Sequence, residues 1–173
     1  NAFAAAVDQK VDIISASWGG SQENPAIRDA LNNASKSGIL TVAAAGNHYK
    51  PPVSFPARYP SSVAVTAVTQ QNQKSSFSSY GDEVSRYGVT AYGSNITSTI
   101  GKNGYAAWNG TSMSTPEGAG VAALGVANAR KANKRLDATQ KAKMLQGSGV
   151  NINLPKNVQG FGRVDAAKIV GAN

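Results

Sequence analysis

The chain has 173 residues, of which 41% are hydrophobic and 15% are charged. A chain of this length buries about two-thirds of the surface that its unfolded form exposes, so residues 1–173 are expected to form one globular domain. No apolar run approaches the length of a membrane-spanning helix. The chain has no cysteine, which excludes disulfides and thiolate metal sites, and His48 is the only histidine, which excludes a multi-histidine zinc site.

The net charge of +8 is compatible with a polyanionic partner. Six of the basic residues gather late in the sequence and could form a phosphate-binding stripe: Arg130, Lys131, Lys134, Arg135, Lys141 and Lys143. However, aromatic residues are few, and cations are favoured near the carboxyl end of a helix. We therefore expect solvated charges here and no nucleic-acid partner.

The first half of the chain predicts buried strands that alternate with helices. Its predicted elements are an amphipathic helix fragment at Asn1–Lys10, strands at Val11–Ser15, Ile39–Ala45 and Val63–Val68, and a helix from Pro25 to about Gly38. The strands are short β-branched or apolar runs. Asn24 is a suitable N-cap for the helix, and Pro25 suits its first position. Four prolines make His48–Pro60 a loop.

The second half starts with Ser, Gly and Tyr-rich segments and continues as helices. The predicted elements are short β segments at Val89–Ala91, Ile96–Ile100 and Tyr105–Trp108, a buried helix from Thr111 to about Ala132, a helix at Ala138–Gln146, and a final short helix at Asp165–Val170. Pro116 is tolerated only if it lies in the first turn of its helix. Buried strands alternating with helices predict an α/β fold, in which a parallel sheet carries helices on both faces.

Ser112 lies at the start of the long predicted helix, within the segment Asn109–Pro116. The unpaired N–H groups and the positive end of the helix dipole favour negative charge that develops near its Oγ. This position suits a nucleophile. Taken alone, the segment also suits a simple helix N-cap at Thr111 or Ser112.

Asn47 follows the predicted strand Ile39–Ala45 at its carboxyl end, the edge at which open α/β sheets place their ligands. A neutral side-chain amide can donate to an oxyanion without forming an ion pair. The alternative is an ordinary turn asparagine after Gly46.

Together these segments resemble the subtilisin-like serine proteases, the subtilase family. Six blocks carry the resemblance, in the family's order: SASWGG at Ser15–Gly20, AAAGN at Ala43–Asn47, FPARYPSSVAVTAV at Phe55–Val68, SSFSSYG at Ser75–Gly81, GTSMSTP at Gly110–Pro116 and GFGRVDAAK at Gly160–Lys168. The blocks extend over essentially the whole chain. The resemblance implies a subtilisin-like α/β fold and acyl transfer, with Ser112 as nucleophile and with Asn47 and the Ser112 N–H as oxyanion donors.

The resemblance also implies a substrate-binding surface. Ser17, Trp18 and Gly19 match the family strand that pairs with extended substrate backbone, and Ala44, Ala45 and Gly46 match one wall of the primary specificity pocket. Trp18 stands where the family more often has a smaller aliphatic residue. We therefore expect altered selection of the substrate side chains near it, and a peptide or protein as the substrate.

The chain departs from the family in its catalytic triad. The family order is Asp, then His, then Ser, and the motifs for Asp and His lie upstream of the segments present here. A serine needs a positioned base, so we expect this polypeptide alone to be inactive and to require an N-terminal subtilase portion that supplies both residues. The absence of an initiator Met from the fragment at Asn1–Lys10 agrees with this expectation. The alternative is a non-catalytic pseudoprotease or regulatory subunit that binds peptides without cleaving them.

Three further positions depart from the family or test its chemistry. His48 directly follows Asn47, on the oxyanion side, and is expected to be a loop residue at the pocket rim rather than the base. Glu117 stands where the family usually has a histidine outside the triad, and is either a charge in the first turn of the helix or an acidic group near Ser112. Tyr92-Gly93 replaces a common Pro-Gly turn.

No cofactor is required by this chemistry, whereas calcium sites are frequent in the family. Asp82 and Glu83 alone do not provide the six to eight oxygen ligands of a calcium site. Carbonyl groups of the Ala57–Ser62 loop are the more suitable candidates for a weak cation site. The resemblance further implies a secreted or otherwise extracytoplasmic protein.

Overall fold

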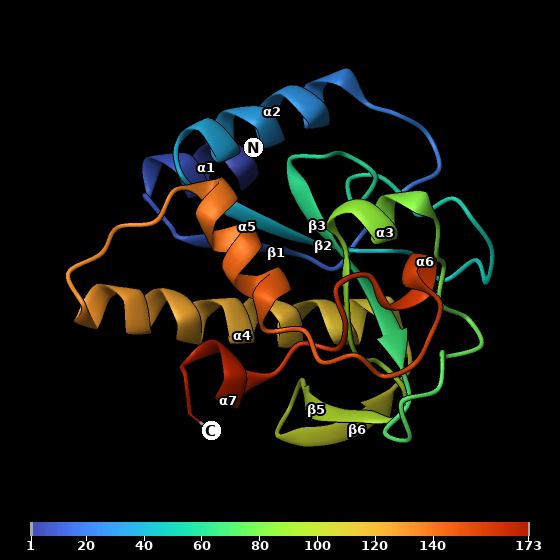
Figure 1. Cartoon of the computed structure of the whole chain (residues 1–173). Helices are drawn as coiled ribbons and strands as arrows, with labels where there is room; N and C mark the ends of the chain where they lie inside the picture. The colour runs from blue at the N-terminus through green and yellow to red at the C-terminus, as the bar shows by residue number, and fades with distance from the viewer. Residues whose placement is uncertain (1, 173) are drawn as a thin grey trace.

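The computed structural model describes residues 2–172, which form a four-stranded parallel sheet, flanking helices and a separate antiparallel hairpin (Figure 1). The sheet has the order β1-β2-β3-β4 and contains β1 (Ile13–Ala16), β2 (Leu40–Ala44), β3 (Ser62–Val68) and β4 (Val89–Tyr92). The hairpin contains β5 (Ile96–Ile100) and β6 (Gly104–Trp108). The predicted α/β fold with a parallel sheet is confirmed, and the strand boundaries lie within two residues of those expected.

The helices are α1 (Ala2–Asp8), α2 (Pro25–Lys36), α3 (Asp82–Tyr87), α4 (Thr111–Lys131), α5 (Ala138–Gly147), α6 (Lys156–Gln159) and α7 (Ala166–Ile169). The sequence did not predict α3 and α6. Both are shorter than two turns, and so carry no helical periodicity that could be recognised. Within residues 2–172, the helices lack the combination of length and apolar character that a membrane crossing needs.

Helices cover both faces of the sheet, as predicted. On one face, α4 and α5 pack against alternate strand residues such as Val42 and Val65. On the other face, Ala43 and Ala64 contact residues of α3 and of the proline-rich loop between β2 and β3. Residues of α1 and α2, which lie beside β1 and β2 (Figure 1), form a further apolar cluster. At Gly118, an added Cβ would already touch both valine side chains, at 3.5 Å, so the glycine allows α4 to approach the sheet closely.

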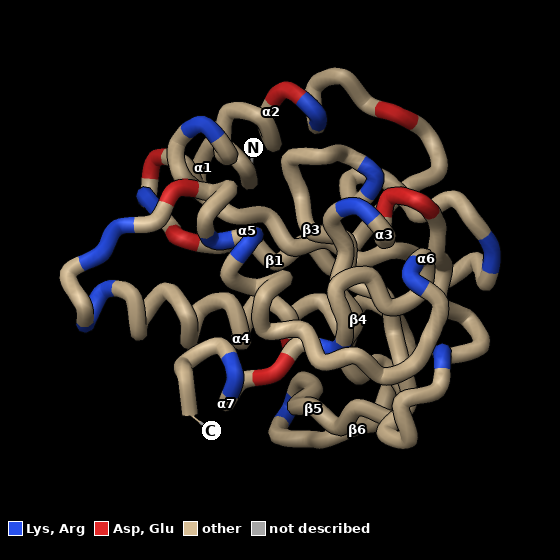
Figure 2. The backbone as a smooth tube through the Cα atoms, viewed as in Figure 1, with Lys and Arg blue, Asp and Glu red and all other residues tan. Residues whose placement is uncertain are grey.

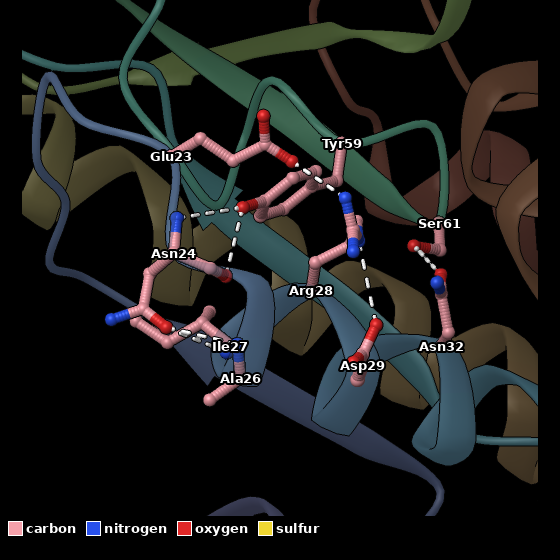
Figure 3. Close-up of polar contacts among 9 residues, drawn as sticks. All are labelled: Glu23, Asn24, Ala26, Ile27, Arg28, Asp29, Asn32, Tyr59 and Ser61. Carbon is pink, nitrogen blue, oxygen red and sulfur yellow. Dashed lines mark hydrogen bonds and ion pairs between the residues drawn. The ribbon is translucent and has the colours of Figure 1, made fainter.

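The N-terminus of α2 forms as the sequence predicts. Asn24 Oδ1 accepts the N–H groups of Ala26 and Ile27 at 3.0 and 3.2 Å, and Pro25 occupies the first turn. The Tyr59 hydroxyl accepts the N–H of Asn24 at 3.2 Å and donates to its carbonyl at 3.1 Å (Figure 3). The proline-rich loop is therefore tied to the helix that covers the sheet.

The basic residues near the carboxyl end of α4 are not all solvated, contrary to expectation. Lys141 is 4% exposed, and its Nζ donates to Asp12 Oδ1 at 3.0 Å and to the carbonyl of Gly38 at 2.8 Å. Arg130 binds the other carboxylate oxygen of Asp12. These three side chains line a cavity of about 950 Å³, which lies at the amino edge of the sheet and does not include Ser112 or Asn47. Figure 2 shows how Lys and Arg gather where α4 leads into α5.

Removal of the Asp12 carboxylate is expected to destabilise the fold. In Asp12→Ala, the buried Lys141 ammonium loses its counter-charge. This loss should lower the free energy of unfolding by about 3 kcal/mol. The value is the low end of the range for breaking a buried ion pair, because Asp12 is partly exposed. Lys141→Met is the matched control and should cost less, because it removes the buried charge and leaves Asp12 paired with Arg130. Urea unfolding of the intact protein measures both. Equal stability of Asp12→Ala and wild type would contradict this account.

Candidate functional site

Ser112 and Ser17 come together at the carboxyl edge of the sheet. Ser17 follows β1, and Ser112 is the second residue of α4. The Ser112 hydroxyl donates to the Ser17 carbonyl at 3.0 Å, and the Ser17 hydroxyl donates to the Ser112 carbonyl at 2.9 Å. This reciprocal pair joins the predicted nucleophile to the predicted substrate-binding segment across 95 residues of sequence.

Pro116 makes this pairing possible. It lies inside α4 and beyond the first turn, where the sequence analysis did not expect it to be tolerated. Proline has no N–H to donate to the carbonyl four residues earlier, which is that of Ser112. The Ser17 hydroxyl takes the place of this donor.

Thr111 fixes the orientation of Asn47. The Thr111 N–H and hydroxyl both donate to Asn47 Oδ1 at 2.9 Å. A backbone N–H can only donate, so the amide atom that faces it must be the oxygen. The amide nitrogen of Asn47 is therefore left free to donate elsewhere. The sequence suggested Thr111 only as a helix N-cap, whereas Gly110 is the N-cap and Thr111 instead binds Asn47.

The two predicted oxyanion donors flank one common space beside Gly110. A Cβ added to Gly110 would lie 3.4 Å from Asn47 Nδ2 and 3.6 Å from the backbone nitrogen of Ser112. The second residue of a helix has no acceptor within that helix for its N–H. The two predicted oxyanion donors, Asn47 Nδ2 and the Ser112 N–H, thus lie near the same point beside Gly110.

Gly46 holds the strand end in a shape that only glycine adopts easily. Its φ is +104°, and a Cβ there would lie 2.4 Å from the Ser54 hydroxyl. Its N–H donates to the Thr111 hydroxyl at 3.1 Å. Ala44 and Ala45, the other two residues of the predicted pocket wall, are buried, and the C=O of Ala45 is bound to the Ser54 N–H at 2.8 Å.

The predicted substrate-pairing segment leaves Trp18 exposed. Its side chain is 47% exposed and makes an edge contact with Phe3, with ring centroids 6.3 Å apart. Gly19 allows close packing against Phe55, because a Cβ there would lie 2.8 Å from the Phe55 carbonyl. The next residue, Gly20, exchanges two backbone hydrogen bonds with Phe55, both of 2.9 Å.

His48 is an exposed loop residue that does not bind Ser112. The backbone N–H of His48 donates to the Ser79 hydroxyl at 3.1 Å, while the Ser112 hydroxyl donates to the backbone carbonyl of Ser17. A carbonyl oxygen is too weak a base to take the serine proton at neutral pH. Among the described residues, the Ser112 hydroxyl therefore has a backbone carbonyl as its acceptor and no side-chain base.

Glu117 lies in the second turn of α4 rather than in the first, so of its two predicted alternatives the helix-start charge is wrong. Its carboxylate accepts the N–H of Tyr92 at 2.9 Å. Burial raises the pKa of the Glu117 carboxyl, and the Tyr92 hydrogen bond and the positive charge of Arg163 partly oppose this increase. The sequence did not predict that Tyr92 and Arg163 interact with Glu117, because both lie far from it along the chain.

The raised pKa of Glu117 predicts a pH-dependent stability. The folded protein binds a proton at this carboxyl more readily than the unfolded chain does. The resulting stabilisation is present below about pH 4.3, the ordinary glutamate pKa, and is lost as pH rises through the raised value. The free energy of unfolding of the wild type, relative to Glu117→Gln, should therefore fall across this window. Urea unfolding at several pH values measures the difference, and a difference that does not vary with pH would contradict the prediction.

Two carbonyl groups of the loop proposed for a weak cation site already accept hydrogen bonds. The carbonyl of Arg58 accepts the Tyr87 hydroxyl, and the carbonyl of Tyr59 accepts both the N–H and the hydroxyl of Ser62. Glu83 is paired with Arg58 at 3.5 Å. Among residues 2–172, no three carboxylate or histidine side chains come close enough to hold a metal ion.

Comparisons with known proteins place this site in a family. A model of the subtilase family matches residues 1–162. Thermitase from Thermoactinomyces vulgaris is 39% identical over 171 residues, which cover 98% of this chain and 58% of thermitase. Subtilisin E from Bacillus subtilis (strain 168) is 43% identical over 128 residues, which cover 72% of this chain and 33% of that protein.

A solved structure shows the same architecture. The prenylagaramide maturation protease PagA matches with a TM-score of 0.90 and 25% identity, covering 99% of this chain and 65% of PagA. The 173 residues thus span less than two thirds of each of these three proteins. Because the family model matches most of the chain and thermitase is similar across nearly all of it, the chain belongs to the subtilase family.

Proposed function

We propose that this chain is the nucleophile-bearing part of a serine endopeptidase. Ser112 is the nucleophile, and Asn47 Nδ2 and the Ser112 N–H are the oxyanion donors. The observation that carries the proposal is the orientation of Asn47: Thr111 binds its amide oxygen and leaves its nitrogen beside the space next to Ser112. Preorganised donors of this kind stabilise the oxyanion that forms during acyl transfer.

The reaction proceeds through an acyl-enzyme. Ser112 Oγ bonds to the scissile carbonyl carbon while its proton passes to a base, and the carbonyl oxygen becomes an oxyanion held by the two donors. The C–N bond then breaks, and the leaving amine takes the proton from the base. Water then attacks the ester in the same way and releases Ser112.

The base comes from outside these 173 residues. We propose an N-terminal subtilase portion that carries Asp and His, in keeping with the greater length of thermitase and PagA. Strand β1 supports this proposal, because it lies at the edge of the sheet and pairs only with β2 among residues 2–172. Beside it, a groove of about 630 Å³ lies between β1 and α4, and its lining includes Ile13, Ala123 and Val126. An added strand would cover these apolar side chains.

The substrate is proposed to be a peptide in extended conformation that lies along Ser17–Gly19. Trp18 is exposed there, so the substrate residue beside it contacts a large aromatic surface. We also propose that the protein acts outside the cytoplasm.

A serine-directed phosphonate probe tests the proposal. The intact protein, including its N-terminal portion, should be labelled at Ser112, as located by mass spectrometry of the modified peptide. Residues 1–173 alone should be labelled far more slowly, and mixing with the N-terminal portion should restore the rate. Equally fast labelling of the isolated chain would overturn the requirement for an external base.

A non-catalytic peptide-binding protein is the second candidate, because no base contacts Ser112 within the described residues. It predicts that the intact protein binds extended peptides, that phosphonate does not label it, and that the bound peptides remain uncleaved.

A further inference from the structure

The backbone N–H of Tyr92 is bound in an unusual way for a strand residue. Tyr92 ends β4, and its N–H donates to the Glu117 carboxylate of α4 at 2.9 Å rather than to a neighbouring strand. A buried N–H without an acceptor is costly, so this position needs a partner. Glu117 is that partner, and it is itself partly buried.

The residue after β4 is hydrogen-bonded to the segment that precedes Ser112. Gly93 follows Tyr92 directly; its N–H donates to the Val68 carbonyl at 3.0 Å, and its carbonyl accepts the N–H of Gly110 at 2.8 Å. The fit is tight, since a Cβ on Gly93 would lie 2.8 Å from the Gly110 carbonyl. Gly110 is the N-cap of α4, two residues before Ser112. Tyr92 is thus connected to the start of α4 through Gly93 and its hydrogen bond with Gly110.

Arg163 holds the other side of Tyr92. Its guanidinium lies 5.0 Å from the centroid of the Tyr92 ring, binds the Tyr92 hydroxyl, and donates to Asn72 Oδ1 at 2.8 Å. The segment around Arg163 is anchored to β4, because the Val164 N–H donates to the Thr90 carbonyl at 2.9 Å. Tyr92 is thus fixed at its backbone by Glu117 and at its side chain by Arg163.

We propose that Glu117 is a positioning residue for Ser112: by accepting the Tyr92 N–H, it fixes the end of β4 and, through Gly93 and Gly110, the start of α4. The inference rests on the proposed function, because it assumes that Ser112 is the nucleophile. Glu117 acts through these residues and does not touch the reacting atoms.

Steady-state kinetics of the intact protein on a peptide substrate tests this role. Glu117→Ala should lower kcat about tenfold and leave KM within about twofold, since small displacements of a catalytic group reduce the rate of the chemical step. Glu117→Gln retains an oxygen that can accept the Tyr92 N–H, and should keep kcat within about threefold of wild type. Glu23→Ala, at an exposed carboxylate in the loop before α2, is the control and should leave kcat unchanged. Phosphonate titration of Ser112 corrects each kcat for any inactive fraction.

A second variant removes the donor instead of the acceptor. Tyr92→Pro has no N–H at this position, so the loss caused by Glu117→Ala should shrink from about tenfold to less than about threefold in that background. An equal loss in both backgrounds, or a full loss in Glu117→Gln, would overturn the proposal. Ser112→Ala keeps the two hypotheses apart: kcat close to that of the wild type in that variant would refute the proposed function, whereas normal kcat in Glu117→Ala would refute only the positioning role.

Discussion

Ser112→Ala is expected to lower kcat of the intact protein by about 10⁶, the size of effect established for the nucleophile of subtilisin. The variant keeps the oxyanion donors but has no oxygen to form the acyl-enzyme. A small residual rate should remain, because the donors still stabilise attack by water. Hydrolysis of a chromogenic peptide, followed over long incubation, measures both rates.

Ser114→Ala is the matched control for this variant. Ser114 lies on the same helix turn, is buried, and donates to the Thr111 carbonyl at 3.0 Å, so it has the same chemistry without access to substrate. Its kcat should stay within about tenfold of wild type, since it changes only local packing. If Ser112→Ala were as active as Ser114→Ala, Ser112 would not be the nucleophile.

Asn47→Ala is expected to lower kcat by about 10² to 10³ with little change in KM, as for the loss of one oxyanion donor in subtilisin. The donor acts on the charge that develops in the transition state, so binding of the uncharged substrate is largely unaffected. Asn47→Asp should be at least as impaired, because the carboxylate still accepts from Thr111 but places negative charge next to the oxyanion.

The adjacent residue provides the control for Asn47. His48 is exposed, and only its backbone N–H is held, by Ser79, so His48→Ala should leave kcat unchanged. A large loss in His48→Ala together with normal kcat in Asn47→Ala would reverse the assigned roles of these two neighbours.

The sequence predicted the elements that carry a strong local signal. The apolar runs that became β2 and β3 are buried along their whole length, so their composition alone distinguishes them. The Asn24-Pro25 start of α2 follows from a side chain that binds its own helix. Local chemistry fixes these features, and no knowledge of the rest of the fold is needed.

The missed features depend on residues that are distant in sequence. Lys141 was expected in solvent, but its ammonium binds Asp12, 129 residues away. Glu117 was interpreted from its place on a helix, whereas its role depends on Tyr92, 25 residues earlier. Pro116 was expected in the first turn of its helix. It lies further along because the Ser17 hydroxyl replaces the N–H that proline lacks, and Ser17 is far from Pro116 in the sequence.

A structure of the intact protein with a phosphonate bound covalently to Ser112 tests the central claim most directly. We predict that the phosphonyl oxygen lies about 2.7–3.1 Å from both Asn47 Nδ2 and the Ser112 backbone nitrogen. An adduct whose oxygen points away from Asn47, with Nδ2 out of hydrogen-bonding reach, would contradict the account.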